Sequence, residues 1–209
     1  MSTVERILKP STTKKNNIIT VTGVSGSGKD YLVGQALTHY KNTWFDEVTI
    51  FNFGTELFNF LTAAPSATKI DNRDAMKNLS SEEIDDSVSM AIASLLALQP
   101  ALNLAHVAFF TKGKMQLNPG NEKIINPHEY IFVRSAPELI QAWRQAENSR
   151  RQRPTETLDQ IQMHQNLAYL MTYGLAQSLG LGLIVINNDP AFTDRSVSVI
   201  AEETNTYLR

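Results

Sequence analysis

Five short runs of apolar and β-branched residues stand out along the chain, and they predict the strands of a sheet. They occupy residues 17–22, 47–53, 106–111, 130–135 and 181–186. Their apolar positions are nearly continuous rather than alternating, which is typical of central strands covered by helices on both faces. Segments with helical periodicity separate the runs. Strands that alternate with helices predict a mostly parallel sheet with right-handed crossovers.

Several of the intervening helices have recognisable ends. The sequence "SSEE" at 80–83 has the spacing of a capping box, and "SAPE" at 135–138 repeats it. The stretch 155–178 has leucine and isoleucine at helical spacing, and Gly180 after it predicts a C-terminal stop.

The lengths of the intervals predict how the chain is organised. Residues 1–16 are polar and lack an apolar signal core, so they predict a flexible leader, followed by a single domain over 17–209. Two crossovers are much longer than a helix requires, and they predict insertions at about 54–104 and about 136–180. Insertions above the carboxyl ends of strands are where α/β proteins place substrate-handling segments.

Composition excludes several classes of protein. The chain of 209 residues has no cysteine, which excludes disulfides, thiolate nucleophiles and cysteine-ligated zinc. A net charge of −2 gives no basic field for nucleic acid or an anionic membrane. The longest apolar runs are well short of the roughly 18 residues that span a bilayer, so we expect a soluble cytoplasmic protein.

The stretch "GVSGSGKDY" at 23–31 carries the main chemical signal. Gly23, four further residues, Gly28 and Lys29 follow a predicted strand and precede a predicted helix from about 28 to 40, which is the context of a phosphate-binding loop. Glycines let backbone N–H groups converge on phosphate oxygens, and the helix N-terminus favours the negative charge. A turn that binds nothing would not need all of these features together. We therefore expect ATP to bind at Gly23, Ser25, Gly26, Ser27, Gly28, Lys29, Asp30 and Tyr31.

Other stretches follow this loop in a distinctive order: "FNFGTELF", "DNRDAMKNL", "RQRPTETLDQIQMHQ", "MTYG" at 171–174 and "IVINN" at 184–188. Together they resemble the archaeal-type adenylate kinases, a branch of the P-loop nucleoside monophosphate kinases, over most of the chain. The resemblance implies a P-loop NTPase fold, a three-layer α/β/α arrangement with a five-stranded parallel sheet and helices on both faces. It also implies a monophosphate under the first insertion and an arginine-bearing lid in the second.

The resemblance implies that the γ-phosphoryl group of Mg²⁺-ATP is transferred to a nucleoside monophosphate, with AMP as the expected acceptor. Lys29, Arg151 and Arg153 are the expected catalytic residues, because arginine forks clamp phosphate oxygens in pairs. Arg73 and Thr55 are the candidates for binding the monophosphate, although a plain surface role is equally open for Thr55. Similar archaeal enzymes are often trimers, so a homo-oligomer is expected by analogy.

Arg144 is a weaker candidate for the phosphates, because it has Glu138 and Glu147 as partners on its own helix. None of the four histidines has metal-ligand spacing, and for His164 we expect a packed helix position.

The chain departs from the family pattern at three places. Asp30 stands where the loop usually has Ser or Thr. The family ends its third strand in Asp-Thr-His, and a match on the threonine gives Phe110, Thr111 and Lys112, which lack an acidic group. The arginine that usually follows His-Gln in the family is also missing.

These departures leave two roles open for Asp30 and more than one function. We favour Asp30 as a Mg²⁺ ligand that replaces the missing strand-end acid, because hard cations prefer carboxylate oxygens. The alternative role is a favourable charge in the first helical turn. The alternative functions are a nucleotide-binding switch or slow ATPase without phosphotransfer, and a kinase for a different (deoxy)nucleoside monophosphate.

Overall fold

Strands and helices alternate along most of the chain. The computed structural model describes residues 4–11, 15–41, 43–63, 70, 75–76, 79–111, 114–117, 119–147 and 156–208. The strands are β1 (Val4–Leu8), β2 (Ile18–Thr22), β3 (Thr49–Asn52), β4 (Ala101–Leu104), β5 (Ala108–Thr111), β6 (Lys114–Leu117), β7 (Glu129–Arg134) and β8 (Gly182–Asn187). The α-helices are α1 (Lys29–His39), α2 (Phe53–Ala63), α3 (Ser81–Ala97), α4 (Pro119–Ile125), α5 (Pro137–Glu147), α6 (Leu158–Leu179) and α7 (Thr193–Leu208), with 3-10 turns η1 (Trp44–Glu47) and η3 (Pro190–Phe192).

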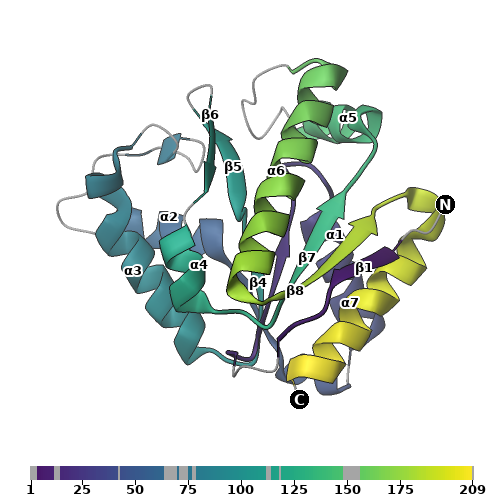
Figure 1. The fold of residues 1–209 in the computed structure, drawn as a ribbon, viewed down its shortest axis with the longest axis horizontal. Helices are drawn as coiled ribbons and strands as arrows, with labels where there is room; N and C mark the ends of the chain where they lie inside the picture. Colours follow the sequence, from purple (N-terminus) through teal and green to yellow (C-terminus); the bar gives the residue numbers. More distant parts are fainter. Residues whose placement is uncertain are drawn as a thin grey trace.

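The main sheet has the strand order β1-β8-β7-β2-β4-β3 in the described residues (Figure 1). Its strands β3, β4, β2, β7 and β8 are mutually parallel, so the predicted five-stranded parallel sheet is confirmed. The phosphate-loop strand β2 lies at the centre, between β4 and β7. The architecture is that of a P-loop NTPase, with one antiparallel strand added at an edge.

The added strand corrects the prediction of a flexible leader. Val4–Leu8 forms β1 and pairs antiparallel with β8, with a register irregularity between Arg6 and Leu8. The Arg6 guanidinium bonds to Glu129 of β7 and to Glu203 of α7, so the strand is also held by side chains. A short segment with charged residues does not have the apolar pattern of a strand, and β1 forms because the edge of β8 offers it hydrogen bonds.

The third strand of the sheet was also predicted wrongly. It is Ala101–Leu104, not the run 106–111, of which Ala108–Thr111 pairs instead with Lys114–Leu117 in a separate two-stranded sheet. The polar Asn103 interrupts the apolar run of β4; its side-chain Nδ2 donates to Thr20 Oγ1 on β2 at 3.2 Å, while its buried Oδ1 accepts no hydrogen bond from the described residues. A partner on a neighbouring strand therefore makes a polar residue acceptable in a buried strand.

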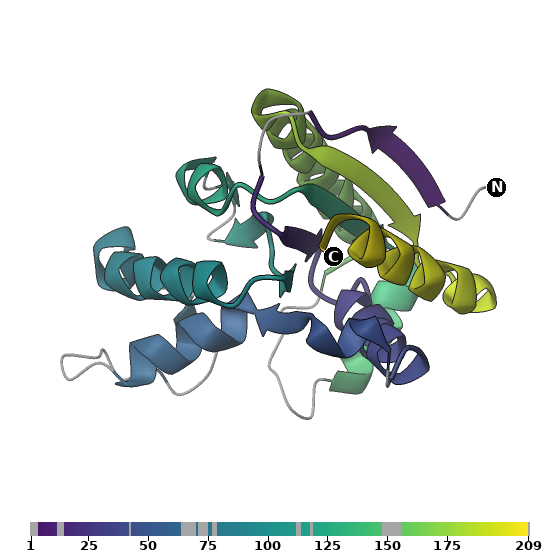
Figure 2. The same ribbon diagram turned by 90° about the horizontal axis from the view of Figure 1, so that it is seen from below.

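Helices cover both faces of the sheet and bury the core between the layers. The apolar side chains of α1 and α7 pack against one face, around Leu32 and Ile200. Helix α6 packs against the other face, around Ile161 and Leu175, as Figure 1 shows. Helices α2 and α3 lie beside the β3 edge, and β1 lies at the opposite edge of the sheet (Figure 2). None of the helices in the described residues is long and apolar enough to cross a membrane.

The helix ends confirm most of the predicted signals. Ser80 forms the predicted capping box with Glu83 at the start of α3. Gly180 ends α6, as predicted, in the left-handed conformation at φ 63°. The second predicted capping box, at Ser135, is wrong: α5 begins at Pro137, and the Ser135 hydroxyl donates to the carbonyl of Ser27 instead. Thr157 forms a capping box with Gln160 at the start of α6 that was not predicted from the sequence.

Of the two intervals predicted as insertions, one lies between β3 and β4 along the chain and the other between β7 and β8. The first includes α2 and α3, and the second includes α5 and α6. The predicted range 54–104 extends too far, because it includes β4. Their roles in substrate binding stay predictions.

Candidate phosphate-binding site

The segment between β2 and α1 is a tight glycine loop. Gly28 has a φ of 84° and forms the N-cap of α1, and a Cβ there would lie 2.2 Å from Nδ2 of Asn188. A Cβ on Gly23 would lie 2.3 Å from the carbonyl oxygen of Val133. Side chains at either position would therefore collide with neighbouring strands or their ends. The glycines of the motif are required by close packing as well as by the turn.

The loop is held from the ends of β7 and β8. The carbonyl of Ser27 accepts a hydrogen bond from Ser135 Oγ at 2.8 Å and another from Asn188 Nδ2 at 3.0 Å. Ser135 follows β7 and Asn188 follows β8, so two neighbouring parallel strands direct side chains at one carbonyl. The loop is thereby fixed by the carboxyl edge of the sheet, where α/β proteins bind their ligands.

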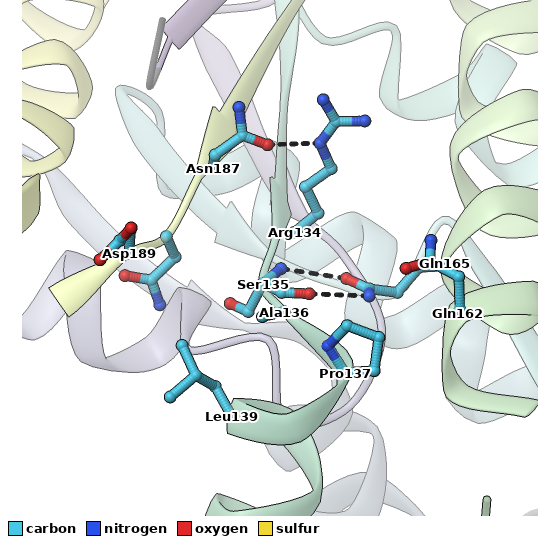
Figure 3. Close-up of a pocket in the computed structure, with 10 residues that line it drawn as sticks. Arg134, Ser135, Ala136, Pro137, Leu139, Gln162, Gln165, Asn187 and Asp189 are labelled. Carbon is cyan, nitrogen blue, oxygen red and sulfur yellow. Dashed lines mark hydrogen bonds between the residues drawn. The ribbon is translucent and has the colours of Figure 1, made fainter. Parts of the chain in front are cut away.

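A cavity of about 330 Å³ is lined by Ser135 and Asn188, the two residues that donate to this carbonyl, and by other residues at the ends of β7 and β8 (Figure 3). Gln165 reaches towards it from α6 and makes two bonds to Ser135, accepting from its backbone N–H at 3.0 Å and donating to its carbonyl at 2.8 Å. Arg134 Nε donates to Asn187 Oδ1 across β7 and β8 in the same view. Four polar residues of the cavity wall are therefore fixed in two hydrogen-bonded pairs, Ser135 with Gln165 and Arg134 with Asn187.

Arg144 on α5 binds the tip of the loop. Its Nε and one terminal nitrogen donate to the carbonyl of Ser25 at 2.9 and 2.8 Å. Its other terminal nitrogen pairs with Glu156, whose second carboxylate oxygen lies 2.7 Å from Nδ1 of His164. His164 is buried, as predicted, with an exposure of 6%. The loop tip, the end of α5 and the start of α6 are thus joined by one polar network.

Lys29 is the first residue of α1 and is largely buried. Its Nζ lies 3.4 Å from Nε2 of His106 and 3.6 Å from Oδ1 of Asp30. Nδ1 of the same histidine lies 2.7 Å from the carbonyl oxygen of Gly23. His106 therefore contacts both the first residue and the lysine of the loop.

The end of the third strand corrects one part of the sequence analysis. The match of the family's Asp-Thr-His to Phe110, Thr111 and Lys112 placed the end of the third strand there, whereas β4 ends at Leu104. Phe110 lies in β5, away from the end of a central strand, so it does not occupy the position of the missing acid. The last residue of β4 is Leu104, which is buried and apolar. The absence of a strand-end acid stays a prediction.

Other predicted residues have different outcomes. Asp30 and Tyr31 lie in the first turn of α1, next to Lys29, and Tyr31 is 55% exposed. Thr55 lies in the first turn of α2, where its backbone N–H and its hydroxyl both donate to Asn52 Oδ1 at 3.2 and 3.1 Å. These bonds give Thr55 a structural role at the start of α2. Its contact with the base of a nucleoside monophosphate stays a prediction. Three predicted substrate residues lie outside the described residues: Arg73, Arg151 and Arg153.

The described residues contain no group of three His, Cys, Asp or Glu side chains that could hold a metal ion by themselves. Magnesium in nucleotide sites usually needs only one or two carboxylates, because phosphates and water complete its shell. The carboxylate of Asp30, 61% exposed at the start of α1, meets this requirement. The donor set therefore fits a metal that arrives with a nucleotide.

Comparison with known proteins agrees with this site. No protein-family model matches the chain. The chain is 27% identical over 192 residues to an adenylate kinase of Pyrococcus abyssi, covering 88% of this chain and 93% of the relative. It is 26% identical to an adenylate kinase of Thermococcus onnurineus over the same shares of the two chains.

A solved shikimate kinase from Bacteroides thetaiotaomicron has a similar fold. The TM-score is 0.55 and the identity 12%, with 90% of this chain and 98% of that chain covered. At this identity the likeness concerns the fold alone. The chain is therefore similar to archaeal adenylate kinases along most of its length, and its fold is that of a P-loop kinase.

Proposed function

We propose that this P-loop phosphotransferase is an ATP-dependent nucleoside monophosphate kinase and that AMP is its acceptor. The observation that carries the proposal is the glycine loop between β2 and α1, with Lys29 at its end and polar groups from β7 and β8 fixing its conformation. The similarity to curated adenylate kinases over 88% of the chain supports the acceptor class.

The loop supplies what a triphosphate needs. Its backbone N–H groups and the N-terminus of α1 favour negative charge, and Lys29 adds a point charge for the β- and γ-phosphates. In the reaction, an oxygen of the acceptor's phosphate bonds to the γ-phosphorus, the bond from this phosphorus to the bridging oxygen breaks, and ADP leaves. Because the acceptor is already a phosphate, positioning and charge stabilisation suffice without a nucleophilic side chain.

Magnesium belongs to this proposal as the companion of ATP. When bound, it neutralises phosphate charge, and Asp30 is the residue of this chain that would hold it. We assign Arg151 and Arg153 to the clamp that closes over the transferred group, and Arg73 and Thr55 to the monophosphate. The homo-oligomer expected by analogy rests on family resemblance alone.

A second function is favoured by a specific observation. The apolar Leu104 ends β4, and a site that requires an acid there for phosphoryl transfer would still bind ATP without it. A coupled assay with ATP and each of AMP, CMP, GMP, UMP, dAMP, dCMP, dGMP and dTMP separates the two functions. We expect ADP formation that depends on AMP. ATP binding without phosphotransfer to any acceptor would favour the switch or slow ATPase.

A further inference from the structure

His106 is fixed beside the phosphate loop by its neighbours in the chain. The backbone N–H of Ala105 donates to the carbonyl of Val21 at 3.2 Å, and that of Val107 donates to Thr22 Oγ1 at 3.1 Å. Both acceptors belong to β2, the strand that leads into the loop. The imidazole therefore sits on a backbone segment that is attached to the loop's own strand.

The bonding of the ring determines which nitrogen carries the proton. The carbonyl of Gly23 can only accept, so Nδ1, at 2.7 Å from its oxygen, must be the N–H. In a neutral imidazole Nε2 is then an acceptor, and it faces the Lys29 ammonium at 3.4 Å. A protonated ring would instead direct a second N–H at the ammonium, placing two donors and two positive charges together. The neutral ring is the form that fits this geometry.

Two charged groups near this ring lie on α1. Lys29 is in contact with Nε2, and Asp30 lies beyond it, 3.6 Å from the same ammonium. From β2 the ring meets the uncharged carbonyl of Gly23. The ammonium therefore opposes protonation of Nε2, and the carboxylate of Asp30 acts in the opposite direction.

We propose that His106 is a positioning residue that holds Lys29 through its neutral Nε2 and takes up a proton when Lys29 is transferred to a bound nucleotide. The inference rests on the proposed function, because it requires Lys29 to bind phosphates. Once the ammonium bonds to phosphate oxygens, Nε2 loses the contact with Lys29 and the phosphates offset the charge of Lys29. A proton from solvent then converts the ring to imidazolium, which still donates to Gly23 through Nδ1 and need not move.

The pH dependence of binding follows from this exchange. The complex holds more protons than the protein alone, so the contribution of His106 strengthens ATP binding as the pH falls through the range in which histidine titrates. The terminal phosphate of ATP also exchanges protons, so the diagnostic quantity is the difference between wild type and variants under identical conditions.

Two substitutions separate the two bonds of the ring. His106→Asn keeps an amide donor near the position of Nδ1 but has no group near Nε2. His106→Gln can present its carbonyl oxygen to Lys29 but cannot titrate. His39→Asn, on the exposed end of α1, is the matched control.

The experiment is calorimetric titration with ATP at pH 7 in buffers of different ionisation enthalpy, which counts the protons exchanged on binding. We expect the wild type and His39→Asn to take up a larger fraction of a proton than either His106 variant. We also expect turnover to fall by about tenfold or more in His106→Asn and by less in His106→Gln, because only glutamine retains an acceptor for Lys29.

The possible failures are distinguishable. If the wild type does not bind ATP, the proposed function is wrong and the inference falls with it. If ATP binds and all four proteins exchange the same number of protons, the proposed function stands and the role of His106 is wrong. If His106→Asn does not fold, judged from its thermal melt, the comparison of wild type with His106→Gln decides.

Discussion

The Nζ of Lys29 lies 3.6 Å from Oδ1 of Asp30, so the lysine of the phosphate loop is paired with the residue that follows it. The carboxylate is 61% exposed, and a pair of this kind contributes little to stability. Its effect is on binding, because an incoming triphosphate must draw Lys29 away from Asp30 and approach a negative charge. The pair adds a third role to the helix-turn and magnesium roles that the sequence leaves open for Asp30.

The first prediction concerns this carboxylate. Asp30→Ser and the isosteric Asp30→Asn should tighten the binding of metal-free ATP by roughly fivefold, about 1 kcal/mol, which is the scale of one charge pair at 4 Å in water. They should also reduce the gain in affinity that magnesium produces, because the metal loses a ligand. Calorimetric titration with and without magnesium measures both effects. If magnesium dependence is unchanged in both variants, Asp30 acts only on the helix turn and on Lys29.

The second prediction concerns the clamp assigned to the segment between α5 and α6. Arg151→Ala and Arg153→Ala should each lower turnover by about a hundredfold, or about 2.7 kcal/mol, and weaken ATP binding much less. A clamp of this kind acts mainly on the transition state. Arg195→Ala, on the exposed surface of α7, is the control and should behave as wild type. Small and equal effects on turnover and binding would identify the arginines as a solvated basic run.

The third prediction concerns the network at the loop tip. Glu156→Ala should lower the free energy of unfolding by about 2–3 kcal/mol, because it removes the carboxylate that pairs with both Arg144 and His164. Glu156→Gln should cost less, since it keeps an acceptor oxygen. A double-mutant cycle with Arg144→Met, measured by chemical denaturation, should give a coupling of about 1–2 kcal/mol. Additive effects of the two substitutions would show that the ion pair does not stabilise the fold.

Sequence patterns succeeded where local physics decides the structure. The strands β2, β7 and β8 are buried on both faces, so their apolar runs are nearly continuous. The capping box at Ser80 involves residues three positions apart, and it formed as the local sequence predicts. The glycine loop was identified for the same reason, because strand, glycines, lysine and helix are contiguous.

The errors have a common cause in partners that are distant along the chain. Asn103 becomes acceptable in β4 only through Thr20, 83 positions away, and Ser135 is withdrawn from its predicted cap by Ser27, 108 positions away. Arg144 pairs with Glu156 on the far side of the 148–155 segment. His106 was recognisable in principle, because a match of the family's Asp-Thr-His on the histidine would have placed it at the end of β4.

The last prediction uses a buried carboxyl group far from the phosphate loop. Glu122 on α4 is 6% exposed and accepts a hydrogen bond from the Tyr130 hydroxyl at 2.6 Å. Burial raises the pKa of Glu122 from 4.5 to about 7, although the bond from Tyr130 acts in the opposite direction. Between these values the folded protein holds more protons than the unfolded chain. The stability contributed by this group therefore falls as the pH rises from about 4.5 to about 7 and is constant above that range.

Glu122→Gln should remove this dependence, because the amide still accepts from Tyr130 and has no charge to bury. We expect the variant to gain up to about 3 kcal/mol over wild type at pH 8 and almost nothing at pH 4.5, since each pKa unit corresponds to 1.36 kcal/mol. Chemical denaturation across this pH range measures the difference. Burial also raises the pKa of Glu129, with the nearby carboxylate of Glu203 acting in the same direction, but Glu129 is present in both proteins and cancels in the comparison. Glu202→Gln, at an exposed position of α7, is the matched control. A gain that is equal at both pH values would show that Glu122 is not buried as a proton-binding group in the folded protein.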